Sequence, residues 1–171
     1  MPLSGRLVTN RWHLSERAAT ISLMSVNPAS MASTQDCTFC AIEAGLLQAS
    51  FVHTDEVVMV FMDLNPVTPG HLLVVPRVHA VGLEDLDEVT GRHVWTIGHR
   101  MARALRRSGL RCEGINVFLA DGEAAFQEVF HFHLHVFPRY AGDGFTIGAN
   151  WAERSRDLLD AEAKAIKGAV V

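Results

Sequence analysis

The sequence predicts an α+β fold built on an antiparallel sheet, and three observations lead to this prediction. Segments of strand type outnumber segments of helical type. The helical segments cluster between and after the strands. Residues 131–137 alternate histidine with apolar residues, which on a strand places three imidazoles on one face and apolar side chains on the other. Such a face suits metal binding, nucleophilic or acid–base chemistry, or an anion clamp, and an ordinary solvent-facing strand is the alternative.

The composition is that of a globular protein with one domain and possible appended segments. The chain has 171 residues, of which 49% are hydrophobic and 20% charged. A net charge of -4 without a long basic block gives no support for binding to nucleic acid or to anionic membranes. The apolar runs are of strand length, so no membrane span is expected. Three cysteines, an odd and low number, favour a reducing compartment, and we expect the protein in the cytoplasm.

The chain divides by composition into three segments. Residues 1–33 carry three arginines against one acid and contain no continuous apolar stretch of the signal-peptide type. We expect them to form a loosely ordered N-terminal extension. Residues 34–145 contain the strand-like segments and form the predicted domain, and residues 146–171 are expected to be a C-terminal helical extension.

The first element of the predicted domain starts at a pair of cysteines. Cys37 and Cys40 are separated by two residues, and a short helix is expected from Thr38, as its N-cap, to Gly45, where it ends. The spacing has three interpretations: a redox dithiol, half of a metal site, or two small buried side chains. The sequence has no second pair of this spacing, so a metal would need histidines from elsewhere.

Strands follow in quick succession. Residues 50–54 and 57–62 are rich in β-formers and are separated by two polar residues, which predicts a hairpin. Residues 63–70 have turn chemistry throughout and lead into another strand at 71–76. Asp63, at the start of this turn, is expected to cap the loop, or alternatively to accept hydrogen bonds from the hydroxyls of a ligand.

The second half of the domain begins with its main helix. Apolar residues recur at intervals of three and four over residues 82–108, and Gly109 is a natural stop. Residues 114–119 have the pattern of a strand, and residues 120–128 form a loop that leads to the histidine segment. Asn150 is a candidate N-cap for a last helix.

The histidine segment and several shorter motifs resemble the histidine triad (HIT) family. The family signature, three histidines alternating with apolar residues, is met by residues 131–137. The resemblance covers about residues 36–140, and it is closest to bacterial single-domain proteins similar to nucleotide phosphoramidases and diadenosine-polyphosphate hydrolases. Its further motifs are Cys37-x-x-Cys40, Asp63-x-Asn65-Pro66, Pro69-Gly70-His71, Pro76-Arg77-x-His79, Gly122-Glu123-Ala124-Ala125-x-Gln127 and Pro138-Arg139.

The resemblance implies a fold and an activity. The fold would be a five-stranded antiparallel sheet with a long helix packed on it, in a homodimer that joins two sheets. The activity would be cleavage at the α-phosphorus of a purine nucleotide, either a phosphoramidate or a dinucleoside polyphosphate. His133 would be the nucleophile that forms a covalent nucleotidyl-histidine, and His135 would contact the phosphate and assist the leaving group. Gln127 would lie near the scissile bond, at the end of a loop whose backbone N–H groups hold the phosphate.

The same resemblance implies a nucleotide pocket. Asp63 gains a second role in it, as the acceptor of both ribose hydroxyls. Phe39, Ile42 and Phe61 match positions that sandwich the base, and plain core packing is their alternative.

A structural zinc ion is also implied, with no organic cofactor. In some bacterial relatives a cysteine pair joins two histidines around zinc, and here those positions are Cys37, Cys40, His79 and His131. Two thiolates and two imidazoles make a closed tetrahedral site. Packing without a metal is the alternative.

Three positions depart from the pattern of many relatives, namely Ala120, Phe126 and Glu128. They put the leaving-group preference and the rate in question, and leave the histidine chemistry intact. Two further functions compete with an enzyme. One is a nucleotide- or partner-binding protein that keeps the fold without catalysis. The other is a metal protein that uses all three triad histidines, which would leave Asp63 and the loop without a role.

Overall fold

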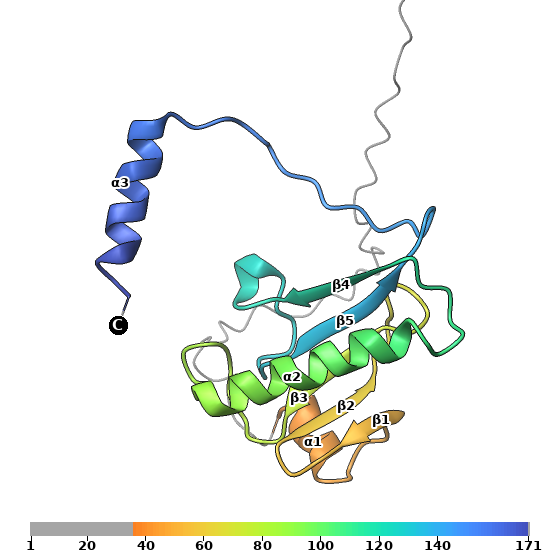
Figure 1. Ribbon diagram of the computed structural model, residues 1–171. Coiled ribbons are helices and arrows are strands. Elements are labelled where there is room, and N and C mark those ends of the chain that lie inside the picture. Colours follow the sequence, from red (N-terminus) through yellow and green to blue (C-terminus); the bar gives the residue numbers. More distant parts are fainter. Residues whose placement is uncertain (1–35, 171) are drawn as a thin grey trace, which may run out of the picture.

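The computed structural model describes residues 36–170, so the expected N-terminal extension lies outside the described residues (Figure 1). In chain order the elements are α1 (Thr38–Glu43), β1 (Phe51–Thr54), β2 (Val58–Met62), β3 (Leu72–Pro76), α2 (Glu88–Leu105), β4 (Gly114–Leu119), the 3₁₀ turn η2 (Glu123–Ala125), β5 (Leu134–Arg139) and α3 (Arg156–Lys167).

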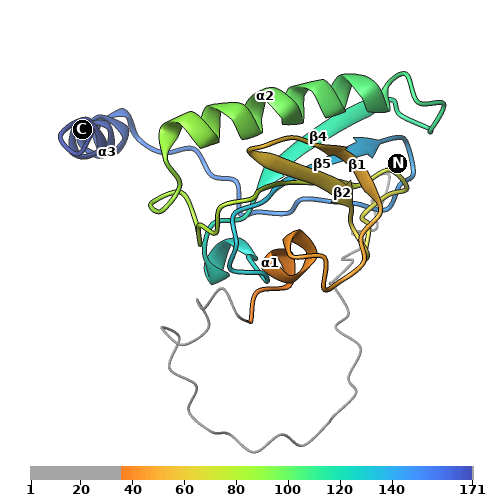
Figure 2. The ribbon, with the colours of Figure 1, turned by 90° about the horizontal axis from the view of Figure 1, so that it is seen from below.

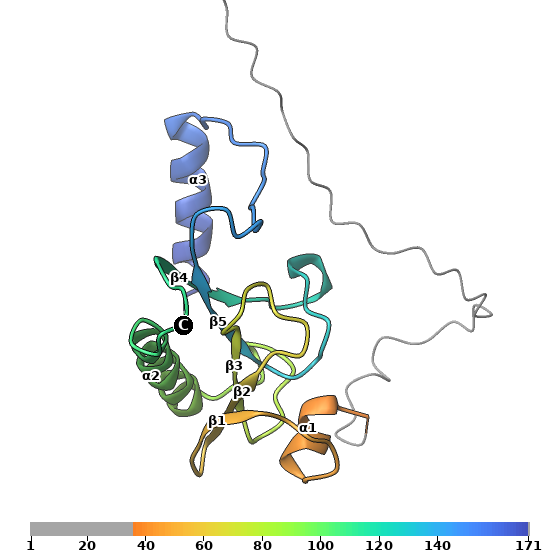
Figure 3. The same cartoon turned by 90° about the vertical axis from the view of Figure 1, so that its right-hand side faces the viewer.

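The strands form one antiparallel sheet, which confirms the predicted α+β class. Its order is β1-β2-β3-β5-β4, so β1 and β4 are the edges. Helix α2 covers one face, and α1 and η2 lie on the other (Figures 2 and 3). The central strands β2 and β3 are almost continuously apolar because both of their faces are covered.

Alternate residues of each central strand enter two separate cores. In β3, Leu72 and Val74 pack under α2, whereas Leu73 and Val75 pack with α1 on the opposite face. The two-residue period of a strand produces this division. The candidate site lies on the α1 face.

Helix α2 is shorter than the pattern over residues 82–108 predicts. It begins after Asp87, whose carboxylate accepts hydrogen bonds from the backbone N–H groups of Val89 and Thr90. Gly98 brings the helix close to β5, since a Cβ at this position would lie 2.9 Å from Cδ2 of Leu134.

The caps of the two other helices differ from the prediction. Cys37, and not Thr38, is the N-cap of α1. Helix α3 begins after Ser155, whose backbone is extended, so the prediction that Asn150 caps it is wrong. Every residue of α3 is exposed, and the helix stands away from the sheet beyond β4 (Figure 1). Within residues 36–170 no helix has the length and apolarity needed to cross a bilayer.

The histidine segment is only partly a strand. Strand β5 starts at Leu134, so His131 and His133 precede it, and the N–H of Phe132 donates to the carbonyl of Ala80. The alternation nevertheless continues through the segment. The apolar residues Phe132 and Leu134 enter the core under α2, and the histidine rings contact side chains of the α1 face.

Candidate active site and zinc site

The ring of His133 lies at the centre of the candidate site. It is 5% exposed and makes edge contacts with Phe39 at 5.2 Å and with His135 at 4.7 Å between ring centroids. Its Nδ1 is 2.7 Å from the carbonyl oxygen of His131. A carbonyl only accepts, so Nδ1 carries the hydrogen and Nε2 keeps a free electron pair. Burial lowers the pKa of His133, against smaller raising effects of that carbonyl, Asp63 and Glu128. The ring is therefore neutral and has the tautomer of a nucleophile at Nε2.

A second hydrogen-bond chain fixes the tautomer of His135. The N–H of Val67 donates to Nδ1 of His71 at 3.1 Å, so the hydrogen of the His71 ring is on Nε2. This Nε2 lies 2.9 Å from Nδ1 of His135 and donates to it. His135 must then carry its own hydrogen on Nε2, where it can be donated to a bound phosphate.

Burial, then His133 and His71, lower the pKa of His135 to about 3. Burial likewise lowers the pKa of His71, although the charge of Asp63 opposes this shift. His135 is thus neutral near pH 7 in this structure. A neutral imidazole can donate its Nε2 hydrogen in a hydrogen bond, but it carries no additional proton.

Asp63 lies at the end of β2 and already caps the following turn. Its Oδ1 accepts from the N–H of Asn65 at 2.8 Å, as the sequence led us to expect. Its Oδ2 is 3.5 Å from Nδ1 of His71 and 3.9 Å from Nδ1 of His135. The contact with ribose hydroxyls remains a prediction, and the carboxylate lies beside these two histidines.

The three apolar residues predicted to hold a base form one wall. Phe39, Ile42 and Phe61 are 5%, 8% and 3% exposed, and the rings of Phe39 and Phe61 meet edge to face at 5.5 Å. They pack as core between α1 and β2, next to His133. The base-binding role stays a prediction.

The side chain of Gln127 organises the loop that follows β4. Its Oε1 accepts from the N–H of Gly122 at 2.7 Å, and its Nε2 donates to the carbonyls of Val81 at 2.7 Å and Val129 at 3.2 Å. The residue is 5% exposed. Its predicted contact with the scissile bond is untested, and in this structure the amide positions the loop.

The predicted zinc ligands come together on the same face. Sγ of Cys37 is 3.4 Å from Nδ1 of His131, and Sγ of Cys40 is 3.3 Å from Nδ1 of His79 and 3.6 Å from Nδ1 of His131. All four ligand atoms lie within 4.8 Å of one another. Ligand bonds of about 2.1–2.3 Å in a tetrahedron give neighbouring donor atoms a separation of roughly 3.5 Å. The four residues therefore fit zinc in number, type and spacing.

The protonation of this cluster also suits a cation. Nε2 of His131 donates to the carbonyl of Pro76 at 2.9 Å, which leaves the Nδ1 electron pair facing the thiols. Burial and the neighbouring Cys37 raise the pKa of Cys40 to about 11, so without a cation its thiol stays protonated. A protonated thiol is a poor nucleophile, which disfavours the redox interpretation. Nε2 of His79 is buried and has no hydrogen-bond partner among residues 36–170, whereas Nε2 of His131 has one within the same residues.

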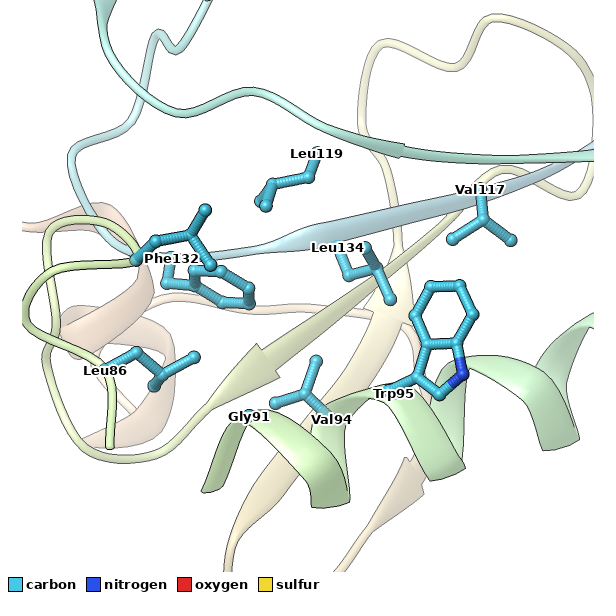
Figure 4. A pocket seen from close by; sticks show the side chains of 9 residues that line it. Leu86, Gly91, Val94, Trp95, Val117, Leu119, Phe132 and Leu134 are labelled. Atoms are coloured by element: carbon cyan, nitrogen blue, oxygen red, sulfur yellow. The ribbon is translucent and has the colours of Figure 1, made fainter. Parts of the chain in front are cut away.

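A different concave surface lies on the opposite face of the sheet. An apolar pocket of about 310 Å³ opens between α2 and β4, with Trp95 and Val117 at its rim (Figure 4). Its lining is almost wholly hydrocarbon, from Leu83, Leu86, Gly91, Val94, Trp95, Val117, Leu119, Phe132 and Leu134. The triad histidines do not line it.

The sequence motifs left the function of His71 unassigned. The residue appeared only as the end of Pro69-Gly70-His71. Its place follows from strand pairing: Leu73 lies opposite His135, and a residue two positions before Leu73 shares its face. The two-residue period places His71 on the same face as Leu73. Only the pairing of β3 with β5, which the sequence does not reveal, shows that this face meets His135.

Comparisons with known proteins agree with this geometry. The HIT domain family matches residues 45–142, which contain β1 to β5 and the whole histidine segment. This chain belongs to the HIT family. Protein hit of Bacillus subtilis is 34% identical over 137 residues, covering 80% of this chain and 92% of that protein. The crystal structure of a HIT family protein from Bacillus anthracis is 35% identical, with a TM-score of 0.72 over 80% of this chain and 98% of that one.

One HIT relative bears on the metal. A zinc-bound histidine triad family protein from Mycobacterium smegmatis is 39% identical, with a TM-score of 0.64, and the match covers 81% of this chain and 100% of that one. A zinc site in our HIT protein is compatible with that relative and with the cysteine and histidine cluster. Membership of the HIT family supports a nucleotide-binding protein of the hydrolase or transferase kind.

Proposed function

We propose that this HIT protein cleaves purine nucleotide substrates at the α-phosphorus through a covalent nucleotidyl-histidine on His133. The observation that carries the proposal is the 2.7 Å hydrogen bond from Nδ1 of His133 to the carbonyl of His131, which directs the electron pair of Nε2 into the site.

The reaction has two steps. Nε2 of His133 attacks the α-phosphorus and the bond to the leaving group breaks, so that the leaving group departs with the bonding pair and takes a proton from water. Water then attacks the phosphorus, the P–N bond breaks, and the nucleoside monophosphate leaves with one proton released. The nucleotidyl-imidazole is cationic, and the carbonyl of His131 stabilises its Nδ1–H. The Nε2–H of His135 stabilises the developing charge on a phosphate oxygen.

The other residues would bind and orient the nucleotide. Asp63 would accept the ribose hydroxyls, and the wall of Phe39, Ile42 and Phe61 would meet the purine. In η2 the N–H groups of Ala125 and Phe126 bond within the turn. Those of Glu123 and Ala124, at the start of the turn, would hold phosphate oxygens.

Zinc would be held by Cys37, Cys40, His79 and His131. Bound there, it would supply structural cross-linking and no reacting group. Since His131 also provides the carbonyl that orients His133, the ion would link α1 to the position of the nucleophile.

The enzyme hypothesis is tested by turnover. Purified protein is incubated with an adenosine phosphoramidate and with a diadenosine polyphosphate, and AMP release is followed for wild type, His133→Ala and His99→Ala. His99 is an exposed histidine on α2 and serves as the matched control. We expect His133→Ala to lose turnover and His99→Ala to keep it, with an AMP adduct trapped on wild type by an alkaline denaturing quench, since a P–N bond is labile in acid. Equal rates of AMP release in wild type and His133→Ala would refute the enzyme hypothesis for these substrates. They would favour the alternative, a protein that binds nucleotides without catalysis.

Zinc is tested separately, by metal content. We expect about one zinc per chain in metal-replete protein, and loss of it in Cys37→Ser plus Cys40→Ser. Cys112→Ser, the third cysteine, is the control. Full zinc content in the double variant would place the metal elsewhere.

We also propose a homodimer that forms across β4. Among the described residues this strand is an edge of the sheet, and Val117 and Phe118 on it are 38% and 37% exposed. Beside it, Trp95 is 62% exposed at the rim of the apolar pocket (Figure 4). A second copy would cover both strand β4 and Trp95. The exposed helix α3 would then have a surface to pack against. Sedimentation should give a dimer for wild type and a monomer for Trp95→Glu, with Leu64→Glu, 93% exposed in the β2–β3 turn, unchanged.

A further inference from the structure

Phe126 combines two features that are each unfavourable. Among the described residues it is the one non-glycine with a positive φ, at 71°, a conformation that costs free energy for any residue with a Cβ. The residue is 81% exposed, so the aromatic side chain gains little from burial. Glycine would satisfy the backbone at no such cost. Neither the backbone conformation nor burial explains a phenylalanine at this position, so we look for a function of the ring other than stabilising the loop.

The surrounding bonds hold the ring outward. The N–H of Phe126 donates to the carbonyl of Glu123 at 2.9 Å, and the N–H of Gln127 donates to the carbonyl of Gly122 at 3.1 Å. The buried amide of Gln127 then ties the loop to the carbonyl of Val81. With the backbone fixed on both sides, the Cα–Cβ bond of Phe126 keeps its direction.

The loop lies on the same face of the sheet as His133. Figures 2 and 3 show η2 on the α1 face, toward the β4 side of the sheet. The side-chain amide of Gln127, the residue after Phe126, and the backbone N–H of His131 both donate to the carbonyl of Val129, which ties the loop to the histidine segment. Phe126 is therefore at the rim of the candidate site and outside its buried interior.

The predicted base wall and the loop that carries Phe126 lie on opposite sides of strand β5. The predicted base wall is built by α1 and β2, on one side of β5, and the loop follows β4, on the other side. In an in-line displacement the leaving group lies opposite the nucleophile on the phosphorus, so a substrate whose base lies at the wall would extend past His133, and the loop lies on the side of β5 away from the wall.

We propose that Phe126 is a stacking platform for a planar aromatic group on the leaving side of the substrate. The inference rests on the proposed function and adds to it the class of leaving group. Both an aryl-bearing amine of a phosphoramidate and the second base of a dinucleoside polyphosphate have the required π-face.

The test compares leaving groups on one nucleotide. We would measure kcat/KM for two adenosine phosphoramidates, one with an indolylethyl amine and one with a butyl amine of similar basicity, and for diadenosine tetraphosphate against adenosine tetraphosphate. Variants are Phe126→Leu, Phe126→Gly and Phe126→Trp. We expect the ratio of aromatic to non-aromatic substrate to fall about two- to tenfold in the leucine and glycine variants and to be kept by tryptophan. The first substrate pair reports on amines and the second on a second base.

Stability gives an independent readout. Phe126→Gly should raise the Tm by about 2–5 °C, because glycine removes the cost of the positive φ, while it lowers the substrate ratio. A gain in stability with a loss of selectivity is not expected of a residue that only shapes the loop.

An unchanged ratio in Phe126→Gly would overturn the inference. If kcat/KM then falls equally for both members of each pair, the ring has a positioning effect. If the protein instead shifts to monomer, the ring belongs to a subunit contact. No turnover of any substrate by wild type would instead refute the proposed function, and the inference with it.

Discussion

Replacing His71 tests the chain of hydrogen bonds that sets the tautomer of His135. His71→Phe keeps a ring of similar size and removes both nitrogens. The N–H of Val67 and Nδ1 of His135 then lose their partners, at 3.1 Å and 2.9 Å. A fully buried polar group left unpaired costs about 1–3 kcal/mol, and both groups are only partly buried, so the free energy of unfolding should fall by about 2 kcal/mol, the lower end for two groups.

The activity should fall for a separate reason. Without the donor at His71, the hydrogen of His135 is free to move to Nδ1, and its Nε2 no longer donates to the phosphate. A hydrogen bond to a charged group contributes about 1.5–3 kcal/mol, which corresponds to a loss of about 10- to 150-fold in kcat. KM should change less, because the effect is on charge that grows in the transition state.

The assay combines AMP release with a direct view of the proton. Nitrogen-15 chemical shifts of the histidine rings report which nitrogen carries hydrogen, and circular dichroism gives the Tm. His71→Gln is the conservative variant, since its amide can accept from Val67 and donate to His135, and it should recover much of the stability and part of the rate. Two results would refute the reasoning: a folded His71→Phe with kcat within threefold of wild type, or a wild-type His135 with its hydrogen on Nδ1.

Three further predictions concern stability and metal. Gly98→Ala should cost about 1–2 kcal/mol of unfolding free energy in urea denaturation, because its Cβ would lie 2.9 Å from Leu134, whereas Gly91→Ala, with its nearest atom at 3.6 Å, should be neutral or stabilising. Acid should destabilise the fold as pH falls from about 6.5 toward 3, since the unfolded His135 takes up a proton that the folded one, with a pKa of about 3, resists. His135→Asn should flatten that slope by up to about 1.4 kcal/mol per pH unit, and an unchanged slope would place the effect in other groups. A strong chelator should lower the Tm of wild type but not of a Cys37→Ser plus Cys40→Ser variant, and equal melting curves would argue against structural zinc.

Much of the fold could be predicted from local pattern. The strand at residues 114–119 was placed at its observed bounds, and the hairpin of β1 and β2 lies where two β-rich runs flank polar residues. The first residues of α2 and α3 were harder to predict. A helix starts where one residue takes an extended backbone and the next turn finds acceptors, and several residues near each start could satisfy that condition.

The candidate site was only partly visible in the sequence. Alternation alone assigned the three triad histidines to one face, and the structure agrees even though only His135 lies within β5. The resemblance grouped the four zinc ligands, and the structure brings their ligand atoms together. The roles of individual nitrogen atoms had no signal in the sequence, because each depends on a partner that the fold supplies.

The sequence by itself determined the α+β class, the sidedness of the histidine segment and the family. These follow from properties that repeat every two residues, or from motifs that lie within a few positions of one another. The tertiary structure decided which imidazole nitrogen carries hydrogen, that His71 acts on His135 across 64 positions of sequence, and that Phe126 stands exposed beside the site. These facts depend on strand register and on backbone bonds between distant segments, and register is set by the packing of the whole sheet.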